Sequence, residues 1–270
     1  MQSPTGQSTR SRWIWALPGL GLIAAAILIA AHLHEQHLAD RLLSVLPDDA
    51  AADPTLLRYA VAQARPLYRT HCAACHGATM QGNPATGAPD LTDHSWLYGD
   101  GSTYEIERTL LYGIRSGHSQ ARNITDMPGF GLRGRLTPGQ IHSLVQYLLK
   151  LSGRVYEAGA AADGRALYAD PAINCGDCHG ADGEGNPDYG APDLTVNTWN
   201  NGADPQSLYD SVYFGRHRIM PAWLGTLSLA QIRALAVYVY VASHPAAAPA
   251  AGNGTWPTAA LAASGPGAFR

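Results

Sequence analysis

The pattern Cys-x-x-Cys-His-Gly occurs twice in the chain, at residues 72–77 and at residues 175–180. The two thiols of this pattern can form thioether bonds to the vinyl groups of a haem, and the histidine that follows can ligate the iron from one face. Each copy is therefore interpreted as a site of covalent haem c attachment, which gives two haems. The residues predicted to attach and ligate them are Cys72, Cys75 and His76 in the first copy and Cys175, Cys178 and His179 in the second.

The composition narrows the class of protein. Hydrophobic residues make up 46% of the 270 residues and charged residues 14%, which is typical neither of a disordered polyelectrolyte nor of a polytopic membrane protein. The two motifs use all four cysteines, so none is left for a disulfide or a reactive thiol. The net charge is -3 and there is no basic stretch, which gives no support for nucleic-acid binding.

The charge differs between the two halves of the chain. Residues 55–151 carry nine basic and six acidic side chains, whereas residues 163–244 carry four basic and nine acidic ones. Because complementary charge speeds encounter, we expect a basic donor protein to dock on the second, acidic half.

The N-terminal region contains one candidate membrane span, over residues 13–31, which has no charged residue. A helix of this length is about 28 Å long, enough to cross a hydrocarbon core. Arg10 and Arg12 precede it and almost no basic residue follows closely, so residues 1–12 are predicted to be cytoplasmic and the rest of the chain to lie outside the cytoplasm. A cleaved signal peptide is the alternative interpretation. Residues 32–54 are predicted to be a linker.

The chain also contains an internal repeat. The two haem motifs are 103 residues apart, and the same offset relates the Gly-Ala-Pro-Asp-Leu-Thr segments at residues 87–92 and 190–195. Further on, Met127-Pro128 corresponds to Met220-Pro221 at an offset of 93, so the first copy has about ten extra residues before its methionine.

Each copy ends in a predicted amphipathic helix with a capping box. Thr137 with Gln140, and Ser228 with Gln231, have the spacing at which an N-cap hydroxyl and a glutamine side chain satisfy the first backbone amides of a helix. The order helix, haem motif, loop, short helix, methionine loop and terminal helix is therefore expected twice, which predicts a mainly α protein.

That order resembles class I cytochrome c domains. The resemblance implies two tandem cytochrome c domains, at residues 55–153 and 163–244, joined by a linker at residues 154–162. With the candidate membrane span before them, the chain is expected to be one N-terminal transmembrane helix followed by these two domains. Residues 245–270, rich in Ala, Pro and Gly, are predicted to be a disordered tail.

The second axial ligand of each iron is predicted to be a methionine. Met127 and Met220 lie at matching positions, each followed by proline, and a thioether there closes the coordination sphere and raises the reduction potential. We therefore assign His76 with Met127 and His179 with Met220. Met80 is a weaker candidate because it follows directly on the first motif.

The resemblance also implies roles around the haems. The carbonyl groups of Pro89 and Pro192 would accept a hydrogen bond from the ligating histidines, which fixes the ring tautomer. Leu91 and Leu194 would pack on the porphyrins. Three arginines between the short helix and the methionine are candidates for binding haem propionates: Arg115, Arg216 and Arg218.

Finer motifs resemble subunit III, the dihaem subunit of cbb3-type cytochrome c oxidases. They are the Gly-Ala-Pro-Asp-Leu-Thr-Asp run at residues 87–93, Trp-Leu-Tyr-Gly at 96–99, Tyr-Gly-Ile-Arg at 112–115 and Met-Pro-Ala-Trp at 220–223. The second copy departs from the family at residues 199–202, Trp-Asn-Asn-Gly, and the segment between the span and the first domain is short.

This resemblance implies a subunit of the bacterial inner membrane with periplasmic haem domains. It would accept electrons from a donor cytochrome c and pass them to a monohaem cytochrome c subunit, from which a haem-copper subunit reduces oxygen and pumps protons. The chain has no copper or haem-copper signature, so no oxygen chemistry is expected on it.

Three other functions are compatible with parts of the pattern. The chain could be the dihaem cytochrome of a periplasmic dehydrogenase or a free-standing anchored carrier, which the motifs alone do not separate from an oxidase subunit. A dihaem peroxidase needs an iron that can open a coordination site, which two Met-Pro loops disfavour. A thiol-disulfide protein would leave the histidines, the methionines and the repeat unexplained.

Overall fold

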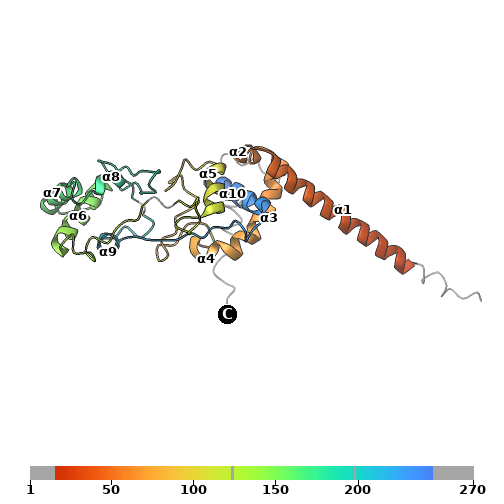
Figure 1. The fold of residues 1–270 in the computed structure, drawn as a ribbon, viewed down its shortest axis with the longest axis horizontal. Helices are drawn as coiled ribbons and strands as arrows, with labels where there is room; N and C mark the ends of the chain where they lie inside the picture. The colour runs from red at the N-terminus through yellow and green to blue at the C-terminus, as the bar shows by residue number, and fades with distance from the viewer. Residues whose placement is uncertain (1–15, 123–124, 198, 246–270) are drawn as a thin grey trace, which may run out of the picture.

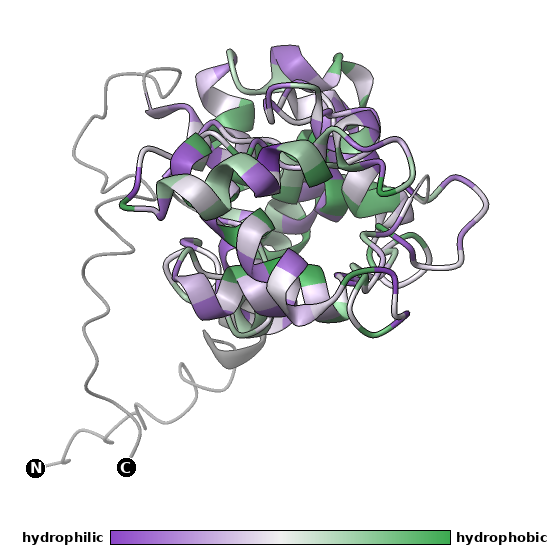
Figure 2. Cartoon of the chain, turned by 90° about the vertical axis from the view of Figure 1, so that its left-hand side faces the viewer, coloured by the Kyte–Doolittle hydropathy of each residue, from purple (hydrophilic) through white to green (hydrophobic). Residues whose placement is uncertain are grey.

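The computed structural model describes residues 16–122, 125–197 and 199–245. These residues form ten helices joined by loops, without a β-strand, which confirms the mainly α prediction. Figure 1 shows a long helix projecting from one end of a helical body. Most helices of the body carry hydrophobic and hydrophilic residues side by side, as the colouring in Figure 2 shows. The predicted cytoplasmic segment 1–12 and nearly all of the predicted tail lie outside the described residues.

The projecting helix is α1, Ala16–Ser44, which is about 43 Å long at 1.5 Å per residue. Its part from Gly21 onward is long and apolar enough to cross a membrane, and large hydrophobic side chains such as Leu22 and Leu28 are exposed along it. The helix continues through residues 32–44, where the sequence predicts a linker. Residues 32–46 contain no proline or glycine, and Pro47 holds Leu46 in an extended conformation and so ends the helical run.

The first haem motif follows a short helix α2, Pro47–Ala50, and a longer one, α3, Pro54–His71. The Asp53 carboxylate caps α3 by accepting hydrogen bonds from Thr55 N and Leu56 N, which lowers the pKa of Asp53. One face of α3 is buried, and it consists of Leu56, Leu57, Ala60, Ala64 and Tyr68. Helices α4, Ala73–His76, and α5, Thr103–Tyr112, complete this half of the chain.

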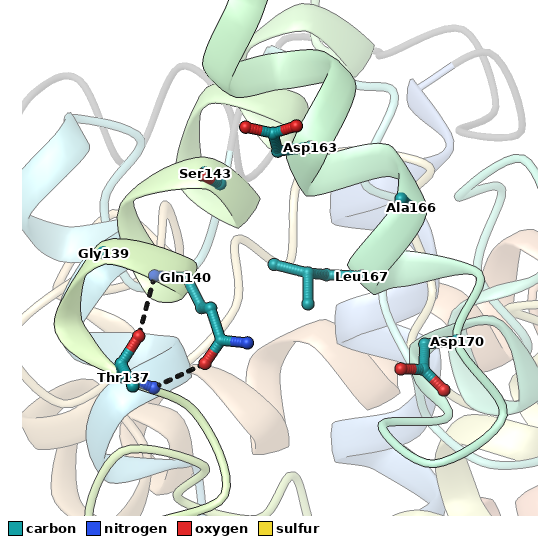
Figure 3. Close-up of a pocket in the computed structure, with 8 residues that line it drawn as sticks. All are labelled: Thr137, Gly139, Gln140, Ser143, Asp163, Ala166, Leu167 and Asp170. Atoms are coloured by element: carbon teal, nitrogen blue, oxygen red, sulfur yellow. Dashed lines mark hydrogen bonds between the residues drawn. The ribbon is translucent and has the colours of Figure 1, made fainter.

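The second half repeats this order. It comprises α6 at Pro138–Leu151, α7 at Ala158–Tyr168, α8 at Cys175–His179, α9 at Pro205–Phe214 and α10 at Leu229–Ser243. Both predicted capping boxes are present, at Thr137 with Gln140 and at Ser228 with Gln231. Figure 3 shows the first of them beside a groove of about 560 Å³ between α6 and α7. None of the predicted haem residues lines that groove.

The terminal helices of the two repeats are exchanged. Helix α10 packs on α3 and α5 of the first repeat, whereas α6 packs on α7 and α9 of the second. Two equivalent tyrosine pairs show this exchange. The ring centres of Tyr68 on α3 and Tyr238 on α10 are 5.9 Å apart, and those of Tyr168 on α7 and Tyr147 on α6 are 5.3 Å apart. The two packing units therefore do not coincide with the consecutive ranges 55–153 and 163–244 that the repeat predicts.

We call these units proximal and distal, by their position relative to α1 (Figure 1). The proximal unit consists of α2–α5 with α10, and it contacts the C-terminal end of α1. The distal unit consists of α6–α9 and has a separate hydrophobic core. Its residues 127–214 carry five basic and ten acidic side chains, whereas residues 54–126 with 215–244 carry nine and six. The exchange therefore leaves the distal unit acidic.

Two chain segments cross between the units. Ile114 and Met220 exchange both backbone hydrogen bonds, at 2.9 and 3.0 Å, and Arg216 N donates to Met127 O at 2.9 Å. Gly113 and Gly215 adopt positive φ where the chain leaves α5 and α9, and a Cβ on either would come within 2.4 Å of the carbonyl oxygen of the opposite methionine. Only glycine fits these two positions without a shift of the methionine loops.

The extra residues of the first repeat form a closed loop before the crossing. Arg115 N donates to Arg122 O and Arg122 N donates to Gly113 O, at 3.0 and 3.1 Å. The loop therefore returns to its starting point, and only the residues after Arg122 are left to reach the distal unit.

Candidate haem sites

Each haem motif is held at the end of a helix by a tyrosine. In the first site, α3 ends at His71, directly before Cys72, and the Tyr68 hydroxyl donates to Gly77 O at 2.7 Å. In the second, the Tyr168 hydroxyl donates to Gly180 O, also at 2.7 Å. Both motifs turn through a short helix that ends at the histidine, so the two thiols and the imidazole of each motif lie within one local structure.

A proline carbonyl orients each histidine, as the resemblance implies. His76 Nδ1 lies 3.2 Å from Pro89 O, and His179 Nδ1 lies 3.1 Å from Pro192 O. A carbonyl oxygen can only accept, so each Nδ1 is the donor and the deprotonated nitrogen is Nε2. Burial lowers the pKa of both imidazoles, which favours the neutral form that ligates iron.

All four cysteines are free thiols in the structure. Burial raises the pKa of Cys72 and of Cys175 to about 11, so both are neutral thiols at physiological pH. Cys75 is exposed and Cys178 half-buried. Each motif therefore presents two unpaired thiols beside one neutral imidazole, the donor set that covalent haem attachment requires.

The two predicted methionine ligands lie in different units from those that the sequence offset predicts for them. Met220 packs on the proximal core, to which Cys72 and Leu91 also belong. Met127 packs on the distal core together with Cys175 and Leu194. The methionine that shares a unit with His76 is therefore Met220, and the one that shares a unit with His179 is Met127. The sequence offset pairs them the other way because it cannot register the exchange of segments.

Met80, the weaker candidate for an iron ligand, lies in the core of the proximal unit. It is fully buried, has a positive φ of 66°, and its carbonyl oxygen accepts a hydrogen bond from Leu91 N at 2.7 Å. In the second repeat, the carbonyl of Gly183 takes the same bond from Leu194 N at 2.7 Å. The backbone at this position thus holds the leucine loop beside each histidine.

Trp96 provides a further test of whether haem fits the proximal site. Its Nε1 is buried, and no acceptor for it lies among the described residues. The corresponding Trp199 Nε1 donates to Val196 O at 2.7 Å. A buried donor without a partner is costly, and a carboxylate at the edge of a bound haem would satisfy it. The proximal residues therefore fit a haem with its propionates.

The three arginines predicted to meet propionates lie at the crossing between the units. Arg115 Nε donates to Arg218 O at 2.7 Å and lies 3.5 Å from the Asp126 carboxylate. Arg216 bonds to Ser211 Oγ, and Arg218 to Asn201 Oδ1. Arg122, which the sequence did not single out, pairs with Glu105 and lies over the Tyr98 ring. Arg115 and Arg218 thus join the crossing segments, whereas Arg122 and Arg216 bond to the helices that precede them, α5 and α9.

Comparisons with known proteins match both repeats of the sequence. A family model described as cytochrome c matches residues 61–152, and one described as cytochrome c oxidase, cbb3-type, subunit III matches residues 159–239. A cbb3-type cytochrome c oxidase subunit CcoP of Cereibacter sphaeroides is 40% identical over 190 residues, and a subunit FixP of Bradyrhizobium sp. (strain ORS 278) is 42% identical over 193. These alignments cover 70% and 71% of this chain but 63% and 64% of the relatives' length.

A FixP of Rhizobium meliloti (strain 1021) is 32% identical over 213 residues, which cover 79% of this chain and 71% of that protein. The chain belongs to the CcoP/FixP family of cbb3-type cytochrome c oxidase subunits. Cytochrome c domains of this family imply covalently bound haem c. Together with the apolar helix α1, membership in the CcoP/FixP family supports a membrane-anchored protein.

The exchanged pairing predicts which methionine each haem loses on substitution. In a variant with Cys175 and Cys178 replaced by serine, only the first motif can attach haem. In that background we expect Met220→Ala to abolish the methionine-to-iron charge-transfer band of the oxidised haem and Met127→Ala to leave it. The control is the reciprocal background with Cys72 and Cys75 replaced, where the two effects should be reversed. Loss of the band in the Met127 variant of the first background would contradict the pairing.

Proposed function

We propose that the chain is a dihaem c-type electron-transfer subunit of a cbb3-type cytochrome c oxidase. The observation that carries the proposal is the duplicated site, in which two thiols and an imidazole fixed by a proline carbonyl recur in both units. Membership in the CcoP/FixP family favours this function over the cytochrome of a periplasmic dehydrogenase or a free-standing carrier.

We infer that His76 and Met220 ligate one iron and that His179 and Met127 ligate the other. Each haem, when bound, supplies a reversible one-electron couple at its iron. The chain's own residues would hold the group: the proline carbonyls orient each imidazole, and the crossing segments place each methionine in the unit of the histidine with which it is paired. With two protein ligands proposed at each iron, we assign no oxygen chemistry to this chain.

The arrangement of the units suggests a direction for electron flow. Among the described helices, those with extensive contacts to α1 are α3 and α10. Both belong to the proximal unit, so this unit lies nearest the membrane. The proposed acceptor of its electrons is a monohaem cytochrome c subunit, followed by a haem-copper subunit. The distal unit is acidic and is the proposed docking site of a donor cytochrome c. We place residues 1–12 in the cytoplasm and both units in the periplasm of a bacterial inner membrane.

The oxidase assignment predicts the composition of the native complex. Purified from its own membrane, the chain should carry two covalent haems in a pyridine haemochrome assay and should bring a haem-copper subunit with it. Replacing Cys175 and Cys178 by serine should reduce the covalent haem content to one per chain. Two covalent haems with no haem-copper subunit would support the free-standing carrier instead.

The acidic distal unit predicts a salt-dependent reaction with the donor. Asp182 and Asp188 are exposed in the loop that follows the second haem motif. Neutralising both as Asp182→Asn and Asp188→Asn should lower the rate of donor oxidation at low salt by about two- to tenfold, and salt should reduce the difference by screening. Stopped-flow kinetics on the purified complex measures this.

The matched control removes the same charge from the other end of the molecule. Asp40 on α1 and Asp49 on α2 are exposed, and their replacement by asparagine should leave donor oxidation unchanged. Equal effects of the two double variants, or a rate indifferent to ionic strength, would show that the donor docks elsewhere.

A further inference from the structure

Arg233 is a buried arginine on α10 that joins three elements of the structure. Its Nε donates to Glu107 Oε2 on α5 at 2.7 Å. Its Nη1 donates to Leu42 O and to Val45 O, at 3.1 and 3.0 Å, where α1 ends. The residue is 9% exposed and Glu107 is 7% exposed. One guanidinium thus connects the last of the described helices, α10, with the short helix α5 of the first repeat and with the end of the membrane helix α1.

The end of α1 needs such a partner. The last carbonyl groups of a helix have no intrahelical donor and form the negative end of its dipole. Here that end is packed into the proximal core, where Leu42 is fully buried together with Ala50. The Arg233 guanidinium supplies donors to two of the carbonyls in this region, and the Glu107 carboxylate balances its charge, as a buried cation requires.

Other polar contacts between the α1 region and the proximal unit lie at the surface. Gln63 donates to Glu35 Oε1 at 2.7 Å, and Arg41 pairs with Asp53 at 2.9 Å, both in exposed positions. Exposed pairs of this kind contribute little because water and salt compete for both partners. Arg233 differs from them in its burial and in its two bonds to carbonyl groups at the end of α1.

We propose that Arg233 is a positioning residue that fixes the direction of α1 relative to the proximal haem unit. Helix α1 continues without a break through residues 32–44 into that unit. A fixed junction therefore holds the helix at one angle to the proximal unit. The junction then holds the proximal unit at one orientation to the membrane and to an acceptor embedded in it. This role rests on the proposed electron-transfer function, because transfer between centres requires a maintained separation and orientation.

The exchange of helices is what makes this junction possible. Arg233 lies on α10, at the C-terminal end of the chain, and it reaches α1 only because α10 packs on α3 and α5. The equivalent position on α6 is His142, which is exposed and lies 3.4 Å from Glu157 of the distal unit. The arginine therefore occurs in the copy of the terminal helix that meets the membrane helix.

A double variant separates this positioning role from folding. Arg233→Met alone would leave the Glu107 carboxylate buried without a partner, which can unfold the unit. Arg233→Met combined with Glu107→Leu removes both charges and keeps apolar volume in the core, while the end of α1 loses its two donors. The matched control is Arg108→Met, which replaces an exposed arginine next to Glu107 on α5.

The test uses the full-length chain in membranes. Hydrogen exchange of the amides in residues 43–53 should become about tenfold faster or more in the double variant, because two hydrogen bonds from a charged donor are lost. In oriented membrane multilayers, the angular dependence of the electron paramagnetic resonance signal of the proximal oxidised haem should broaden. Haem content and the optical spectrum should stay as in the wild type, and Arg108→Met should change none of these readouts.

Wild-type exchange at residues 43–53 and an unchanged angular dependence in the double variant would overturn the proposal. If the double variant fails to fold, Arg233→Lys is measured instead: it retains the charge but cannot bond both Glu107 and the two carbonyls, so it should show the same changes in smaller measure, and wild-type behaviour would be the overturning result. Hydrogen exchange does not depend on activity. A failure of the electron-transfer function would instead appear in the wild type, as missing haem or a missing oxidase partner.

Discussion

Each of the two units is completed by a helix that the sequence assigns to the other repeat. Helix α10 is buried on nearly every side, against α3, α5 and the C-terminal end of α1. A helix that is apolar all round needs such burial, because exposing it to water would be costly. Helix α6 has the same relation to α7 and α9. Because the exchange is reciprocal, the two sequence repeats, residues 55–153 and 163–244, cannot separate without exposing the apolar faces of α6 and α10. The methionine loops precede these helices in sequence and are carried across with them.

This constraint determines how the sites are built. Each histidine is fixed by local structure, namely the turn of its motif and the carbonyl of Pro89 or Pro192. Each methionine arrives from the other repeat along a crossing segment held by backbone pairs at Ile114 and Arg216. In the proposed ligand sets, the histidine comes from one repeat and the methionine from the other. Each iron site therefore depends on the folding of both repeats. The same exchange brings Arg233 to the end of the membrane helix.

The features that could be predicted from the sequence are those set by neighbouring residues. The haem motifs, the capping boxes, the buried face of α3 and the histidine–proline hydrogen bonds all depend on short spacings. The exchange could not be predicted, because α6 and α10 have equivalent apolar faces and equivalent tyrosines, Tyr147 and Tyr238, so either helix could close either unit. Which one does is decided by the connecting segments, whose extra loop closes on Gly113 and gives no periodic signal.

The junction with the membrane helix was missed for a related reason. Charged and polar residues past residue 31 predict the end of the membrane span, and two prolines further on predict a linker. In the structure these residues have adequate helix propensity and continue α1, while Leu42 and Ala50 are buried by a helix from the far end of the chain. Burial by a distant segment cannot be inferred from a local pattern.

The reciprocal exchange can be tested by cutting the chain between α6 and α7. Val155 is 95% exposed in the connection between them, and a protease recognition sequence placed between Val155 and Tyr156 allows cleavage of the folded, haem-loaded protein in its membrane. The exchange predicts that the C-terminal fragment stays bound to the membrane-anchored fragment after the cut and is released only by denaturant. Release of the C-terminal fragment under native conditions, with its haem spectrum intact, would contradict it.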